Sequence, residues 1–348
     1  MPVDSSTLSR LVLRHFRCFG AFETDLAPGL NLIVGPNAHG KTSVLEAACI
    51  LLRLQSPRTS RLGDVIQHDQ RGFVVDGYAG ARRLQFYFSS RRKKLALDGV
   101  EQASAQEYLA IGRVVYFSMS DIEIVRGSAD ARRRFLDFVA MQRDSGYRRA
   151  LRDFEKALRS RNVLLKAPSP RWREIEAFDQ PLLTAGEEIT RSRLRLIQEL
   201  QPHTQAAHHA ISDSREILRL EYLPGSGPDF AEALAAARGE DARLRQTTVG
   251  PHRDDLRFIV NERGSQFASE GQQRTIVLAL RIAAARVLEE RFETAPTLLL
   301  DDIFGELDPK RRAALLAALP AASQKVITLT SLVWVPPEAE AHVLRLGE

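Results

Sequence analysis

A glycine-rich octapeptide lies between two patterns that predict different secondary structures. Before it, residues 29–34 form a short apolar run that predicts a strand, and after it residues 41–54 have helical spacing. The octapeptide reads Gly35, Pro36, Asn37, Ala38, His39, Gly40, Lys41 and Thr42, and Ser43 follows. It matches G-x-x-x-x-G-K-[ST] in the strand-to-helix context that this phosphate-binding motif requires. The chain is therefore predicted to contain an α/β domain built around a phosphate loop.

Each residue type in the loop has a physical reason. The glycines let successive backbone N–H groups turn toward phosphates, and the helix N-terminus adds positive potential. Lys41 can reach the β- and γ-phosphates, and the Thr42 hydroxyl can coordinate Mg²⁺. None of the seven lysines has Asp two residues later, as a guanine-reading N-K-x-D or T-K-x-D motif requires. ATP is therefore the expected nucleotide.

A second apolar run ends in two carboxylates. Residues 297–301 predict a buried strand that ends in Asp301, and Asp302 follows directly. The carboxyl ends of parallel strands are where α/β proteins bind ligands. We expect Asp301 to hold Mg²⁺, directly or through water, and Asp302 to polarise water near the γ-phosphate. The alternative interpretation is an Asp-Asp turn that only caps a helix.

The separation of the two motifs constrains the domain organisation. About 255 residues lie between Thr42 and Thr297, far more than a compact nucleotide-binding domain needs. From residue 130 to about residue 213 the pattern is almost wholly helical. We therefore predict an α/β head, formed by residues 1–128 and 246–348, that is interrupted by a mainly α-helical domain at residues 129–245.

Further elements follow from the same periodicities. Strands are predicted at residues 11–22, 73–78, 82–88, 93–97, 114–117, 217–222, 256–260 and 325–329. Helices are predicted at residues 147–166, 180–200, 271–292 and 310–318. The short runs between residues 73 and 97 indicate a small antiparallel sheet.

Composition argues against several classes of protein. The only cysteines are Cys18 and Cys49, outside any CxxC pair, so neither a disulfide framework nor a thiolate zinc site is expected. No apolar run reaches the ~18 residues that a membrane span needs. Residues 1–10 are polar and include Asp4, unlike a secretory signal, so a cytoplasmic location is expected. Arginine makes up 42 of the 49 basic residues. That excess permits a nucleic-acid partner, although a GC-rich genome would give the same bias.

Two further segments flank the acidic strand. Before it come Ser269, Glu270, Gly271 and Gln272, and after it come Gly305, Glu306, Leu307 and Asp308. The order of phosphate loop, S-x-G-Q, hydrophobic-Asp-Asp and x-E-L-D resembles ATP-binding-cassette heads, and within them the SMC-like DNA-repair ATPases. Residues 35–46, 125–137, 249–256 and 300–308 resemble the RecF family. The resemblance implies a P-loop ATP-binding-cassette-type head interrupted by an SMC-like arm.

The same resemblance implies a nucleotide site completed by a second copy of the chain. Three residues would act in cis on Mg²⁺ and ATP: Lys41, Thr42 and Asp301. Three others would close over the γ-phosphate bound to the second copy: Ser269, Gly271 and Gln272. ATP would thus hold a homodimer together, with Lys41 and Asp302 as the catalytic residues. The alternative for Ser269 is a simple N-cap of the helix that follows it.

Several positions depart from the family pattern. His39 stands where the RecF loop usually has glutamine, and residues 117–121 lack the usual Pro-Glu. No glutamine of the usual Q-loop kind lies near residues 115–117, and Ser331 marks the place where cassette ATPases carry a switch histidine. Asp302 replaces the longer glutamate that is common at the hydrolytic position. A slow ATPase is therefore expected.

The resemblance also implies partners. RecF proteins act with RecR and RecO to place RecA on gapped DNA, so binding to gapped or junction DNA without sequence preference is expected. The densest basic groups, which are the candidate phosphate contacts, are residues 91–94, residues 132–134, and Arg148, Arg149 and Arg152. Two other hypotheses remain open: the ATPase subunit of a membrane transporter, and a nuclease-associated ATPase.

Overall fold

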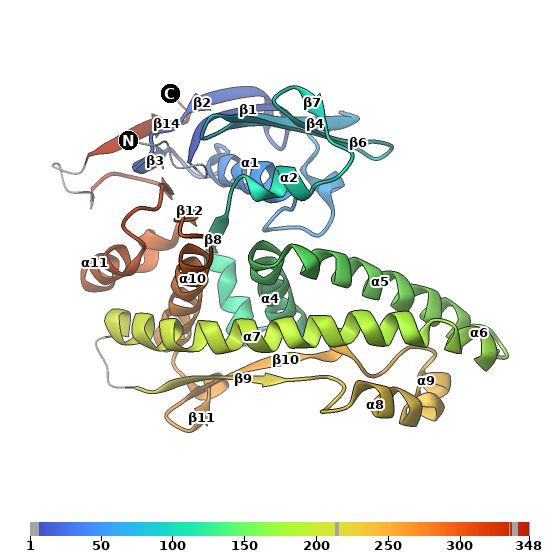
Figure 1. Ribbon diagram of the computed structural model, residues 1–348. Coiled ribbons are helices and arrows are strands. Elements are labelled where there is room, and N and C mark those ends of the chain that lie inside the picture. The colour runs from blue at the N-terminus through green and yellow to red at the C-terminus, as the bar shows by residue number, and fades with distance from the viewer. Residues whose placement is uncertain (1–6, 213–215, 334, 336–339, 348) are drawn as a thin grey trace. The chain divides into compact units, whose positions relative to one another are not determined.

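The structure, a computed structural model, describes residues 7–212, 216–333, 335 and 340–347. Residues 1–6, part of the segment predicted not to be a secretory signal, lie outside this range. The chain forms two compact units, whose elements are labelled in Figure 1. Unit 1 consists of Met1–Asp121 and Arg281–Glu348, and unit 2 of Ile122–Leu280. Among the described residues, no helix is both long and apolar enough to cross a membrane.

Unit 1 contains a parallel sheet with the strand order β14-β3-β13-β12-β8. The strands are β3 (Leu30–Val34), β8 (Val114–Ser118), β12 (Thr297–Asp301), β13 (Lys325–Leu329) and β14 (Ala341–Arg345). The inner strands are nearly continuous apolar runs, as expected where both faces of a sheet are covered. Since the strands are parallel, their carboxyl ends lie along one edge. The phosphate loop follows β3 and the acid pair ends β12, so both reach that edge.

A second sheet of unit 1 is antiparallel, with the order β2-β1-β4-β5-β6-β7. Its strands are β1 (Leu8–Phe16), β2 (Phe19–Asp25), β4 (Gly72–Ala79), β5 (Arg82–Ser89), β6 (Lys93–Leu97) and β7 (Val100–Glu101). The single strand predicted at residues 11–22 is therefore a hairpin. Its turn contains Arg17, whose φ of 52° is positive, so the chain reverses there without a glycine or proline.

Four helices complete unit 1. They are α1 (Lys41–Arg53), α2 (Gln106–Ala110), α11 (Pro309–Ala318) and the later part of α10 (Glu270–Phe292). Helix α1 begins directly after the phosphate loop, and all of its residues except Thr42 are buried. Asp121 forms a buried bidentate pair with Arg281 of α10, at 2.9 and 2.6 Å.

Unit 2 is mainly helical but also contains a small sheet. Its helices are α3 (Glu123–Arg126), α4 (Ala129–Arg143), α5 (Ser145–Leu165), α6 (Trp172–Glu176), α7 (Asp179–Ser212), α8 (Phe230–Ala236), α9 (Arg238–Leu244) and the first part of α10. The sheet has the order β11-β10-β9, formed by β9 (Leu218–Leu223), β10 (Asp255–Val260) and β11 (Arg263–Gly264). Because β10 pairs along its whole length with β9, the predicted division at residue 245 falls inside unit 2.

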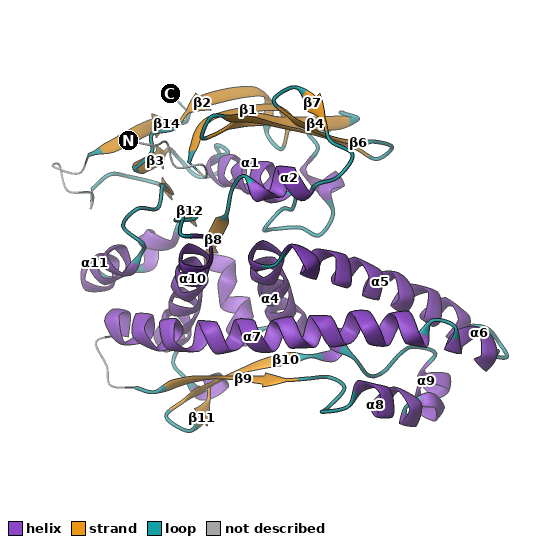
Figure 2. Cartoon of the chain, in the orientation of Figure 1, coloured by secondary structure: helices purple, strands orange, loops and turns teal. Residues whose placement is uncertain are grey.

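The longest helix, α7, continues 12 residues past the predicted end at residue 200 and through Pro202. Its apolar side persists beyond the proline, since Thr204, Ala207 and Ile211 are buried. This packing sustains the helix although proline removes one backbone hydrogen bond. Figure 2 shows α7 running beside β9.

Side chains of α7 bind the backbone of the edge strand β9. Gln201 accepts from the Leu220 N–H at 2.7 Å and donates to the Leu218 carbonyl at 2.8 Å. Gln205 accepts from the Leu218 N–H at 2.6 Å. These residues are four apart, so they lie on one face of the helix.

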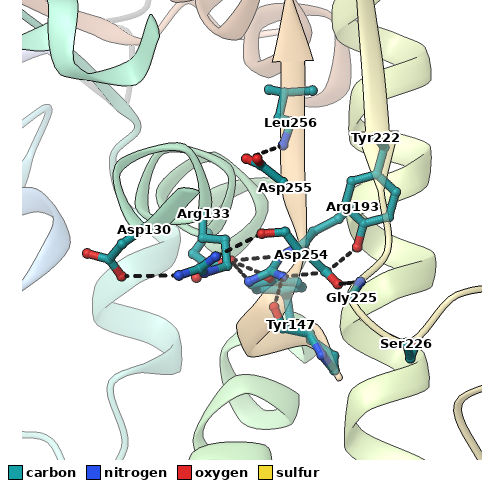
Figure 3. Close-up of polar contacts among 12 residues, drawn as sticks. Asp130, Arg133, Tyr147, Arg193, Tyr222, Gly225, Ser226, Asp254, Asp255 and Leu256 are labelled. Atoms are coloured by element: carbon teal, nitrogen blue, oxygen red, sulfur yellow. Dashed lines mark hydrogen bonds and ion pairs between the residues drawn. The ribbon is translucent and has the colours of Figure 1, made fainter. Parts of the chain in front are cut away.

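A buried arginine lies at the centre of unit 2 (Figure 3). Arg193 of α7 donates to Asp254 at 2.6 Å, to Asp137 at 2.7 Å and to the Pro251 carbonyl at 2.8 Å. Tyr222 of β9 donates to the same carboxylate of Asp254. The Arg193 side chain is 2% exposed, so it ties α7, α4 and the loop before β10 together in a place that water does not reach.

Candidate nucleotide site

The backbone of the phosphate loop contains two residues in the left-handed region. Ala38 and Gly40 have positive φ values of 69° and 89°, the left-handed conformations of a loop that turns its N–H groups inward. A Cβ at Gly35 would lie 2.4 Å from the Leu346 carbonyl oxygen, so no larger residue fits there. The Lys41 ammonium donates to the carbonyl oxygens of Gly35 and Pro36 at 2.6 and 2.8 Å.

A cavity of about 520 Å³ opens at this loop. Eight of the residues singled out in the sequence line it: Asn37, Ala38, Gly40, Lys41, Thr42, Ser43, Asp301 and Asp302. Gly35, Pro36 and His39 belong to the same loop, where the His39 ring bonds the Asn37 carbonyl at 2.9 Å. The cavity is also lined by residues that the motifs did not indicate: Arg17, Cys18, Arg58, Asp64 and Ile66.

Asp301 joins the two distant motifs. Its Oδ1 accepts from the Thr42 hydroxyl at 2.9 Å, although 259 residues separate the two. The same oxygen accepts from the Thr328 hydroxyl at 2.9 Å, and Oδ2 accepts from the Tyr116 hydroxyl at 2.9 Å. Burial and the Asp301 carboxylate raise the pKa of Tyr116 well above its usual value, so its hydroxyl keeps its proton and donates.

Asp302 begins the turn after β12. Its φ is 53°, and its backbone N–H donates to the Thr328 hydroxyl at 2.9 Å. The Thr328 hydroxyl therefore accepts from the backbone of Asp302 while it donates to the side chain of Asp301. Asp302 itself lines the cavity together with Lys41.

A buried carboxylate binds two arginines that line the cavity. Glu46 of α1 is fully buried and accepts two hydrogen bonds from Arg17, both at 2.8 Å. The Arg58 guanidinium donates to Oε2 of the same carboxylate at 3.4 Å, and the Ser56 hydroxyl donates to Oε1 at 2.6 Å. Glu46 thus holds two guanidinium groups at the cavity. The sequence gives one hint of this arrangement, because Glu46 closes the segment that resembles the RecF family.

The residues at the cavity fit a magnesium ion. The Thr42 hydroxyl and the Asp301 carboxylate place two oxygens 2.9 Å apart at its rim. Mg²⁺ prefers such oxygen ligands and usually takes its remaining ligands from water and phosphate. Among the residues that the structure describes, no group of three or more His, Cys, Asp or Glu side chains is arranged to hold a metal ion.

The S-x-G-Q segment belongs to unit 2, not to the residues that line the cavity. Ser269 and Gln272 bond reciprocally: the Ser269 N–H donates to the Gln272 side chain at 2.8 Å, and the Gln272 N–H donates to the Ser269 hydroxyl at 3.3 Å. This is a capping box at the start of α10. The Gln272 amide also donates to Glu216 at 2.7 Å. Gly271 lies half-buried between them.

The basic groups differ in how far they are engaged within the chain. Arg132 is bound to Asp255 at 2.5 and 3.1 Å, and Arg133 donates to the Asp254 carbonyl at 2.8 Å. Both are mostly buried, so they stabilise unit 2. By contrast, Arg149 of α5 is 81% exposed.

The chain matches the model of a protein family described as RecF/RecN/SMC N terminal domain, over residues 7–333. A DNA replication and repair protein RecF of Thermosynechococcus vestitus is 36% identical to it, over 97% of this chain and 95% of the relative. A solved structure of the recombination mediator protein RecF with ATPrS, of the RecFOR pathway, has a TM-score of 0.87 at 28% identity. The match covers 99% of this chain and 97% of that one.

A structure of the SMC head bound to the C-winged helix domain of ScpA covers 94% of this chain and 90% of its own. Its TM-score is 0.53 at 16% identity, a likeness of fold alone. The predicted fold class is confirmed: the protein has an α/β head of the P-loop ATP-binding-cassette type, interrupted by a mainly helical SMC-like arm. Within that class, the chain belongs to the RecF family.

Proposed function

We propose that this protein is an ATP-dependent DNA-binding protein of recombinational repair. The observation that carries the proposal is the contact between Thr42 and Asp301 at the rim of the cavity. It brings a hydroxyl and a carboxylate from distant parts of the chain to the place where a phosphate loop opens. Family membership supports the same function, and it favours recombinational repair over the transporter and nuclease-associated hypotheses.

In this proposal the phosphate loop and the two aspartates have separate roles. The backbone N–H groups of the loop and the Lys41 ammonium bind the β- and γ-phosphates, so the lysine exchanges its two carbonyl contacts for phosphate oxygens. Thr42 and Asp301 hold Mg²⁺, which neutralises charge on the phosphate oxygens. Asp302 orients the attacking water. Because its side chain is one methylene shorter than glutamate, hydrolysis is slow and ATP acts as a switch.

The S-x-G-Q segment acts on a second copy of the chain. The capping box of Ser269 and Gln272 fixes the first turn of α10, and the positive end of this helix suits a γ-phosphate. ATP then lies between two copies and stabilises a homodimer by its binding energy. Gly271 leaves room for the approach of the phosphate.

The proposed contacts with DNA are made by arginine side chains to the phosphates of the DNA backbone. Exposed arginines such as Arg149 and Arg152 on α5 suit phosphate oxygens, and contacts of that kind carry no sequence preference. The dimer therefore recognises gapped or junction DNA by shape. Together with RecR and RecO it promotes the loading of RecA. The solved relative, a recombination mediator protein RecF of the RecFOR pathway, supports a role in that pathway.

Titration with a fluorescent ATP analogue tests the nucleotide site. Lys41→Met removes a charge-assisted contact to phosphate, worth at least ~1.5–3 kcal/mol, so affinity should fall at least about tenfold. Lys156→Met is the matched control, because Lys156 is an exposed lysine of α5 that is not among the residues lining the cavity. Equal affinity of a folded Lys41→Met protein and the wild type would remove Lys41 from the site.

A gel shift on gapped DNA, with and without ATP and over a range of salt concentrations, tests the second half of the proposal. ATP should strengthen binding, and the affinity should fall steeply with salt. Binding that ignores both ATP and salt would contradict the proposal.

A further inference from the structure

We propose that Tyr116 and Thr328 are positioning residues that hold the Asp301 carboxylate in the orientation required for the divalent cation. This inference rests on the proposed function, because it concerns the same Mg²⁺–ATP site. It goes further in assigning the affinity for the cation to two hydroxyl groups that lie on the strands beside β12.

The geometry shows how the carboxylate is held. Asp301 ends β12, which lies between β8 and β13 in the parallel sheet. Tyr116 of β8 donates to Oδ2 at 2.9 Å, and Thr328 of β13 donates to Oδ1 at 2.9 Å. The carboxylate is therefore fixed from both sides, and rotation about its last bond would break both contacts.

Loss of these contacts would be costly, because both hydroxyl groups are buried. Tyr116 is 2% exposed and Thr328 is fully buried. A buried hydroxyl without a partner costs free energy that water cannot offset. Loss of the correct Asp301 orientation would leave the Tyr116 hydroxyl in that state, so the preferred rotamer of Asp301 is set before any cation arrives.

The two contacts give the two oxygens of the Asp301 carboxylate different surroundings. Tyr116 occupies Oδ2, so Oδ1 is the oxygen turned to Thr42, whose hydroxyl lies 2.9 Å away. Thr328 also accepts from the backbone N–H of Asp302 at 2.9 Å. The threonine thus fixes the spacing between the cation-binding carboxylate and the residue proposed to orient water. Such partners of metal ligands commonly change metal affinity 10–100-fold when they are removed.

Tyr116→Phe tests this arrangement, because it removes the hydroxyl and keeps the ring. A fluorescent ATP analogue is titrated with Mg²⁺ to find the concentration that gives half of the cation-dependent binding. We expect that concentration to rise about tenfold, the low end of the usual range for such partners. Binding of the analogue without Mg²⁺ should stay as in the wild type, which a general loss of structure would not allow.

Tyr108→Phe is the matched control. Tyr108 is fully buried in the same unit, and among the described residues its hydroxyl has no hydrogen-bond partner. Its variant should keep the wild-type Mg²⁺ dependence. Thr328→Val, of nearly equal volume, provides a second test of the same kind and should also raise the Mg²⁺ requirement.

The outcomes separate the two proposals. A wild-type chain that binds the analogue without any effect of Mg²⁺, or does not bind it, would overturn the proposed function. A wild type that depends on Mg²⁺, together with Tyr116→Phe and Thr328→Val proteins of unchanged dependence, would overturn this inference alone. If Tyr116→Phe does not fold, the Thr328→Val titration decides in the same way.

Discussion

A fall in pH should destabilise the protein through His252. This residue lies in the turn Pro251–Arg253 of unit 2, where Nε2 donates to the Thr247 carbonyl at 2.9 Å. Among the described residues Nδ1 has no partner, so a second proton would be buried without an acceptor. Burial, the largest cause, and the charges of Arg253 and Arg133 together lower the pKa of His252 to about 4, although the hydrogen bond to Thr247 opposes the shift.

The sign and size of this effect of pH on stability follow from proton linkage. The unfolded chain has the ordinary histidine pKa of 6.5, so between pH 4 and pH 6.5 it binds more protons than the folded chain. The contribution of the neutral His252 ring to the free energy of unfolding is fully present above pH 6.5 and is lost as the pH falls toward 4. The two pKa values give a loss of about 1 kcal/mol at pH 5.5 and about 3 kcal/mol at pH 4.

Urea denaturation of the wild type and of His252→Gln, at several pH values from 7 to 4, measures this loss. The glutamine amide can still donate to the Thr247 carbonyl, but it does not titrate. The free energy of unfolding of the variant should therefore fall less steeply with acid, and the difference between the two curves should approach about 3 kcal/mol. Parallel curves would refute the reasoning, because they would mean that His252 titrates alike in both states.

Three further predictions concern assembly, hydrolysis and stability. Ser269→Arg should prevent the dimer that forms with a slowly hydrolysed ATP analogue, measured by light scattering, while the monomer still binds ATP. A variant that only loses its N-cap would instead be about 1 kcal/mol less stable and dimerise normally. Asp302→Asn should bind ATP but slow phosphate release in a turnover assay, and a wild-type rate would show that Asp302 does not orient water. Arg193→Met should lower the free energy of unfolding by about 3–5 kcal/mol, since it leaves the buried carboxylate of Asp254 without its positively charged partner. Arg191→Met, at an exposed position on the same helix, should change it little.

Elements with strong periodicity could be predicted closely from the sequence. β12 and β13 have the predicted bounds, because an apolar run flanked by polar residues leaves little choice of ends. The hairpin of β1 and β2 was missed since its turn at Arg17 contains neither glycine nor proline. The end of α7 was placed too early because burial of Ile211 and its neighbours, a tertiary effect, outweighs the local effect of Pro202.

The same distinction applies to the site. The phosphate loop and the acid pair could be singled out because each motif is local in sequence. Tyr116, Thr328 and Glu46 could not be, since their significance depends on which strand lies beside which. The register that sets Asp301 opposite Thr328 is a property of the sheet and is not visible in either segment alone.

The hydrogen bonds from the Gln201 and Gln205 side chains to the backbone of β9 have a consequence for solubility. An uncovered strand edge offers N–H and carbonyl groups to any extended chain nearby, and it can recruit a second molecule into a continuous sheet. Here the amide side chains of α7 occupy the outward-facing groups of Leu218 and Leu220. The helix thereby guards the sheet of unit 2 against aggregation at high concentration, a task separate from any contact with nucleotide or DNA.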